Sequence, residues 1–186
     1  MELSLLVLTL MSVGYVCILP FIFFKKGTFN ILWLATAAPY VLVETILILG
    51  QLNIIQPMNI FAGYETTTTI ISAVLGVLGV GLISTTIGVH RVPLALWHQK
   101  EDAPVNIVKH GPYSRIRHPF YTSFICILTG AFLGFPHVAT LAVLVYGVVS
   151  LTLTAKKEEG KLSVSEFGDE YKQYIKETGR FFPRLT

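Results

Sequence analysis

The sequence predicts an all-α integral membrane protein of five transmembrane helices, in which the last two form a helical hairpin and a cytosolic amphipathic helix follows them. Of the 186 residues, 53% are hydrophobic and 13% are charged, about half the charged fraction of a typical soluble domain. No Lys or Arg lies between Lys26 and Arg91, and nothing charged lies between Pro119 and Ala155. A soluble fold of this length could not bury so much apolar surface, so residues 1–186 are interpreted as a single membrane domain.

Residues 1–90 contain three apolar runs, each long enough for one membrane crossing. Residues 3–24 form the first run, and a crossing needs about 20 helical residues. This run differs from a secretory signal peptide, because Glu2 stands where a basic region belongs, the apolar core is too long and no small-residue cleavage site follows. Residues 29–52 and 70–89 predict the second and third spans.

The third predicted span is rich in small residues. They are Ser72, Gly76, Gly79, Gly81, Ser84 and Gly88. Ser72/Gly76 and Ser84/Gly88 have the four-residue spacing of closely packed helices. The glycines do not follow the order of a dinucleotide-binding loop and do not follow a strand, so helix packing is the favoured interpretation.

Residues 119–155 predict a hairpin of two short helices, the fourth and fifth spans. As one helix this run would measure about 55 Å, too long for a single crossing. Gly134 and Pro136 near its middle favour a turn. A four-span arrangement, in which residues 119–155 form a re-entrant loop that returns to the cytoplasmic face, also fits the charges.

The five-span topology places all 14 Lys and Arg residues on one side of the membrane. The opposite side receives the N-terminus, residues 51–69 and the turn around Gly134, and none of these carries a Lys or Arg. Because basic residues mark cytoplasmic loops, we expect the N-terminus outside, and the C-terminus with the active site in the cytoplasm. Cys17 and Cys126 lie in apolar runs and indicate neither a disulfide framework nor a metal site.

Two segments that flank the hairpin, residues 91–118 and 156–184, hold 20 of the 25 charged residues. The hairpin brings the start of the fourth span and the end of the fifth to the same face. Arg117 and His118, at the positive end of a helix that starts at Pro119, are therefore expected to favour anions. An alternative is that the basic residues here are only membrane anchors.

The same geometry predicts that Arg117, His118 and Tyr121 approach the carboxylate pair Glu158 and Glu159. The tail after this pair has apolar residues at helical spacing, and charged residues on its other face. The apolar set is Phe167, Tyr171, Tyr174 and Ile175, and the charged set is Asp169, Lys172, Lys176 and Glu177. Such an amphipathic helix would lie on the membrane or close over the cluster.

Glu44 is an ionisable residue within the second predicted span. A carboxyl group in a bilayer is costly and is a functional-site hypothesis by default. It would line an acceptor path or, protonated, bond to a neighbouring helix, and the sequence leaves both roles open.

Five short motifs follow one another in the C-terminal half, over about residues 105–184. They are Val108-Lys109-His110-Gly111-Pro112-Tyr113, Arg117-His118-Pro119-Phe120-Tyr121, Glu158-Glu159, Glu166-Phe167-Gly168-Asp169-Glu170-Tyr171 and Gly179-Arg180-Phe181-Phe182-Pro183. In this order, with five spans and a hairpin, the set resembles the isoprenylcysteine carboxyl methyltransferase family. The related phospholipid N-methyltransferases share much of it.

The resemblance implies an enzyme that binds S-adenosylmethionine and methylates a lipid-embedded acceptor, such as a prenylcysteine-like carboxylate, that enters from the bilayer. The implied cofactor-binding residues are Val108, Tyr113, His118, Pro119, Tyr121, Glu158 and Glu159. The implied catalytic residues are Arg117, near the reacting centre, and Glu159. Four residues rather than the family's three separate Leu162 from Phe167, which leaves open which glutamate has which role. Neither a metal nor a nucleic-acid partner is expected.

The implied chemistry suits these residue types. S-adenosylmethionine carries a sulfonium, an amino group and a carboxylate, so the glutamates can meet the cations while His118 and the helix N-terminus meet the anion. Methyl transfer from a sulfonium depends on in-line positioning in a dry site. A carboxylate acceptor needs no general base and Arg117 would orient it, whereas an amine acceptor would need His118 or a glutamate as base.

Other functions remain open on the sequence alone. They are a phospholipid or other lipid N-methyltransferase, a non-enzymatic membrane module or small transporter, and a nicotinamide-dependent reductase, because some membrane sterol reductases resemble the Arg117-His118-Pro119 region. A transporter should show polar groups near the bilayer midplane, and only Glu44 qualifies. The sequence fixes neither the acceptor nor the oligomeric state.

Overall fold

The computed structural model describes residues 31–89 and 107–184, with the backbone alone for residues 31–37. The described part is all helical, and the predicted first span at residues 3–24 lies outside it. Its elements are α2 (Ile31–Gln51), α3 (Glu65–Val89), the short 3-10 helix η2 (Gly111–Ser114), α4 (Pro119–Gly134), α5 (Val138–Ser163) and α6 (Gly168–Glu177).

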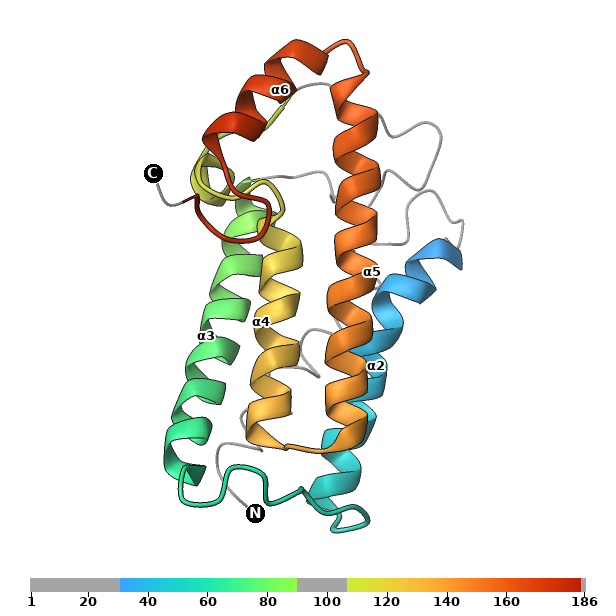
Figure 1. Ribbon diagram of the computed structural model, residues 1–186, viewed down its shortest axis with the longest axis vertical. Coiled ribbons are helices and arrows are strands. Elements are labelled where there is room, and N and C mark those ends of the chain that lie inside the picture. Colours follow the sequence, from blue (N-terminus) through green and yellow to red (C-terminus); the bar gives the residue numbers. More distant parts are fainter. Residues whose placement is uncertain (1–30, 90–106, 185–186) are drawn as a thin grey trace.

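The four long helices run along one another, and α6 lies across one end of them (Figure 1). Helix α3 packs on α4, and α2 packs on α5. Leu47, Leu128 and Leu151 are fully buried where α2, α4 and α5 meet. The α2–α3 connection and the hairpin turn lie at the end opposite α6 (Figure 1), where the Met58 N–H donates to the Pro136 carbonyl at 2.6 Å. The polar groups described below gather at the α6 end.

The predicted hairpin is confirmed, with its turn at residues 135–137. His137 caps α5, because its Nδ1 accepts from the Ala139 N–H at 3.1 Å and its own N–H donates to Thr140 Oγ1 at 3.1 Å. The expectation of two short helices is wrong for α5, which has 26 residues and continues past Ala155 to Ser163. Lys and Glu are good helix formers, so the charged residues after Ala155 extend the helix beyond the apolar run.

The second predicted span agrees with α2 within the described residues. Helix α3 begins at Glu65 rather than at residue 70, so the connection before it is shorter than expected. The cause is local: the Gly63 N–H donates to Glu65 Oε1 at 3.0 Å, and Thr68 Oγ1 donates to the Glu65 carbonyl at 3.0 Å. An acidic residue in the first turn also complements the helix dipole.

Small residues of α3 bring it close to α4. The Ser72 hydroxyl donates to the Gly130 carbonyl at 2.7 Å, and a Cβ added at Gly79 would lie 2.7 Å from Ile127 Cγ1. The packing predicted from Ser72/Gly76 is therefore confirmed. Ser84 and Gly88 are exposed, so the second small pair does not pack against the described part of the chain.

Helices α3 and α5 are each long and apolar enough to cross a membrane. The most apolar stretch of each is only 28% buried. Many of their exposed side chains are large and apolar, among them Ile70, Val74, Val77, Leu78, Leu141, Val145, Val149 and Leu153. Length and composition alone make these two helices candidate spans, while α4 and the described α2 residues 38–51 are shorter apolar helices.

The predicted amphipathic tail is confirmed as α6, with Tyr171 and Tyr174 buried and Asp169 and Lys172 exposed. After α6, residues 178–182 form a segment that we call the strap, which crosses the start of α4. The N–H groups of Arg117 and His118 donate to the strap carbonyls of residues 179 and 180 at 2.8 and 3.0 Å. The segment after α6 therefore closes over the start of α4, and contact of the tail with the membrane stays a prediction.

Candidate functional site

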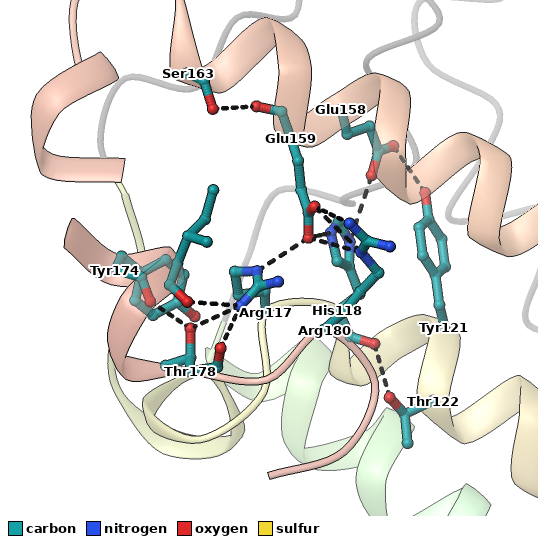
Figure 2. Close-up of polar contacts among 11 residues, drawn as sticks. Arg117, His118, Tyr121, Thr122, Glu158, Glu159, Ser163, Tyr174, Thr178 and Arg180 are labelled. Atoms are coloured by element: carbon teal, nitrogen blue, oxygen red, sulfur yellow. Dashed lines mark hydrogen bonds and ion pairs between the residues drawn. The ribbon is translucent and has the colours of Figure 1, made fainter. Parts of the chain in front are cut away.

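Six side chains converge at the α6 end of the bundle (Figure 2). The start of α4, the charged end of α5 and the strap supply Arg117, His118, Tyr121, Glu158, Glu159 and Arg180. The predicted approach of the basic and aromatic residues to the glutamate pair is confirmed. We call this set the polar cluster.

Glu159 is the centre of the polar cluster. Its Oε1 accepts from Arg117 Nε at 2.9 Å, and its Oε2 accepts from Arg180 Nη2 at 2.6 Å. His118 Nε2 lies 3.3 Å from the same Oε1 atom. Two guanidinium groups therefore neutralise one buried carboxylate through charge-assisted hydrogen bonds, and Glu159 is held as an ion.

Arg117 connects the start of α4 to the end of α6. Its side chain is 8% exposed. Besides the bond to Glu159, its Nη1 donates to the carbonyls of Ile175, at 3.2 Å, and of Thr178. Nε and Nη1 are thus engaged within the protein in this conformation. The role of Arg117 in orienting an acceptor stays a prediction.

Glu158 has different surroundings from its neighbour in sequence. Tyr121 Oη donates to Glu158 Oε1 at 2.7 Å, and His118 Nδ1 lies 3.6 Å from Oε2 (Figure 2). No arginine in the described ranges bonds to Glu158. Tyr121 is therefore its hydrogen-bond donor among these residues, and no guanidinium group neutralises it.

His118 lies between the two glutamates, with its ring stacked on that of Tyr121 at a centroid distance of 5.3 Å. Burial lowers the pKa of His118, against the opposing effect of Glu159. The imidazole is therefore neutral at pH 7, with one nitrogen as donor and the other as acceptor.

Binding of an external anion at the start of α4 stays a prediction, and the anion that lies beside Arg117 and His118 in the structure is the Glu159 carboxylate. The backbone N–H groups of Arg117 and His118 bond to strap carbonyls, and the His118 ring faces two carboxylates. The positive end of a helix attracts negative groups, and here the protein itself supplies them. Pro119 does occupy the first position of α4, as predicted.

Three tyrosines hold α6 against the rest of this end. Tyr171 and Tyr174 are buried on α6, and Tyr113 is buried in η2. Tyr174 Oη donates to the Tyr113 carbonyl. Burial raises the pKa of all three, that of Tyr174 to about 12, so each hydroxyl stays protonated as a donor.

Two predicted cofactor-binding residues lie just before α4. Tyr113 is buried in η2, where its carbonyl accepts from Tyr174 Oη of α6. Val108 is half-buried ahead of η2 and supplies no polar group. The sequence analysis did not identify Arg180 as a partner of Glu159, although Arg180 belongs to the last of the five motifs. Among the described residues, no group of three or more His, Cys, Asp or Glu side chains could hold a metal ion.

The fold and the polar cluster define an all-helical bundle with apolar outer helices and one ionic end. Comparisons of the chain with protein-family models, with curated proteins and with solved structures find no match. The resemblance to the isoprenylcysteine carboxyl methyltransferase family therefore stays a prediction that depends on the motifs.

Proposed function

We propose that the protein is an S-adenosylmethionine-dependent membrane methyltransferase that transfers a methyl group to a lipid-embedded acceptor at the cytosolic face. One observation carries the proposal: two adjacent buried glutamates have divided roles. Arginines neutralise Glu159, whereas Glu158 accepts from Tyr121. In this proposal Glu159 stabilises the fold, and Glu158, which no arginine of the described residues neutralises, would bind the cation of the cofactor.

The proposed membrane position follows from the apolar faces and the basic end. Helices α3 and α5 would cross the bilayer, because both are long and apolar and many of their exposed side chains are large and apolar. Lys156, Lys157 and Lys161 lie in the charged end of α5, at the same end as the polar cluster. Basic residues favour the cytoplasmic side, so the N-terminus would be outside and the cluster would face the cytosol.

The groups present fit the cationic part of S-adenosylmethionine. Glu158 would accept from its amino group or face its sulfonium, with Tyr121 holding the carboxylate and His118 behind it. The bound cofactor would supply an electrophilic methyl group on sulfur. The protein's own contribution would be to position the donor and acceptor and to exclude water, through the buried rings of Tyr121 and Phe120.

Two acceptor classes remain within this proposal. A prenylcysteine-like carboxylate is ionised at pH 7 and needs no base, and Arg117 would act on it as a positioning residue. A phospholipid amine is the second candidate, and for this acceptor His118 would be the group that accepts the proton that the amine must lose.

The decisive experiment is calorimetric titration of S-adenosylmethionine into the detergent-solubilised protein, with NADPH as the rival ligand. Glu158→Gln and His118→Ala should lose binding while retaining a cooperative thermal transition. Glu166→Gln, at an exposed position outside the polar cluster, should bind like the wild type. A folded wild type that does not bind S-adenosylmethionine would overturn the proposal, and binding of NADPH alone would favour a reductase.

A further inference from the structure

Arg180 differs from Arg117 in one respect that matters for a ligand. Its side chain is 31% exposed, whereas the side chains of Arg117 and Glu159 are 8% and 9% exposed. Arg180 therefore stands between the buried part of the polar cluster and the outside. Arg180 is therefore the more accessible of the two arginines that bind Glu159.

The guanidinium of Arg180 retains an unused face. Its Nε and Nη2 donate to Glu159 at 3.1 and 2.6 Å. Within the described ranges, its Nη1 makes no hydrogen bond or ion pair. An arginine can bind two carboxylates at once, because its five N–H donors point along separate edges of a planar fork.

Glu159 does not depend on Arg180 alone for neutralisation. Arg117 Nε bonds to it at 2.9 Å from the buried side, and His118 Nε2 lies 3.3 Å away. Arg180 is thus a second positive charge on a carboxylate that already has a partner. Part of its charge is available to another anion without leaving Glu159 unpaired.

We propose that Arg180 binds the α-carboxylate of the amino-acid part of the cofactor, opposite the cation-binding Glu158. This inference rests on the proposed function and deepens it, since it assigns recognition of a zwitterion to two residues of opposite charge. The strap fixes the backbone of Arg180, whose carbonyl accepts from the His118 N–H at 3.0 Å. The carboxylate and the cation of the cofactor would therefore be bound by the strap and by α5, which are held in fixed positions.

The test compares two ligands that differ by one carboxylate: S-adenosylmethionine and its decarboxylated analogue. A hydrogen bond to a charged group contributes about 1.5–3 kcal/mol, so the wild type should bind S-adenosylmethionine about 10- to 100-fold more tightly than the analogue. Arg180→Gln should lose this preference by weakening S-adenosylmethionine binding alone. Arg184→Gln, an exposed arginine outside the polar cluster, should keep the preference.

Each outcome separates this inference from the proposed function. If the wild type binds both ligands equally, or if Arg180→Gln weakens both by the same factor, Arg180 does not bind the carboxylate, while the methyltransferase proposal stands. If the wild type binds neither ligand, the proposed function fails. Thermal unfolding is measured in parallel, and if Arg180→Gln does not fold, Arg180→Lys replaces it: this variant keeps the charge but not the fork, and it should weaken S-adenosylmethionine selectively.

Discussion

Two glutamates that are adjacent in sequence have unlike environments because successive residues of a helix point about 100° apart. Glu159 points to Arg117, which lies just before α4, and to Arg180 of the strap. Glu158 points to Tyr121. The sequence could place the pair at the end of the fifth span but could not assign the roles. That assignment depends on the rotation of α5 about its axis, which packing decides.

Substitution of Glu159 should affect stability more than substitution of Glu158. Glu159→Gln leaves the buried Arg117 without a counter-ion, and loss of one partner of a buried ion pair costs about 3–5 kcal/mol. Glu158→Gln keeps an oxygen acceptor for Tyr121, so we expect a cost of about 1 kcal/mol. Denaturant unfolding in detergent measures both free energies. Equal losses would contradict the division of roles.

The stability of the protein should fall on acidification through protonation of His118. Burial lowers the pKa of this group in the folded state. As the pH falls through the ordinary value of 6.5, the unfolded chain therefore takes up a proton before the folded protein does. The folded state is therefore favoured above this pH and loses stability as the pH decreases below it. Unfolding temperatures from neutral pH to about pH 5.5 should fall less steeply for His118→Gln than for the wild type.

His110→Gln provides the control for this pH dependence, because His110 is exposed. Its profile should follow that of the wild type. If His118→Gln and the wild type have the same slope, His118 does not titrate differently in the folded and unfolded states.

At the scale of elements, the strap depends on a glycine. A Cβ added at Gly179 would lie 1.7 Å from the Phe182 carbonyl oxygen. The strap could therefore not keep its path, and Gly179→Ala should cost about 1–3 kcal/mol and weaken cofactor binding. Calorimetry and thermal unfolding measure the two effects.

Gly160→Ala is the matched control on α5, where an added Cβ meets nothing within 4 Å in the part of the chain that the structure describes. Alanine is the better helix former, so this variant should be unchanged or stabilised by about 0.5–1 kcal/mol. A Gly179→Ala protein as stable as the control would show that the strap is not needed for the polar cluster.

The hairpin was predictable because its signals are local: a long uncharged run, a Gly and Pro near its middle, and charges at both ends. The strap could not be predicted, although the last of the five motifs contains most of its residues. Its defining contact, a single parallel bridge between Ile116 and Gly179, joins residues far apart in the sequence. Only the packing of α6 against η2 and α5 brings these residues together. The same reason explains why Arg180 was missed as a partner of Glu159.

At the scale of the whole molecule, the charge distribution predicts an orientation that can be measured. Asn59 lies in the α2–α3 connection, Lys172 lies on α6, and both are exposed. In a background with Cys17 and Cys126 replaced by Ser, Asn59→Cys should react with an impermeant maleimide on intact cells. Lys172→Cys should react only after permeabilisation. Reaction of both positions from the same side would refute the proposed topology.

The strap also imposes an order on biosynthesis. Ribosomes make α4 and α5 before residues 178–182, so the hairpin can enter its final environment while Arg117 and Glu159 still lack Arg180 and the carbonyls of the strap. Contacts between distant parts of a chain form late, because loop closure must precede them. The polar cluster can therefore be completed only after both hairpin helices are in place. In a ribosome-bound chain that is stalled before Thr178 leaves the exit tunnel, α6 should be sensitive to protease and the hairpin should be resistant.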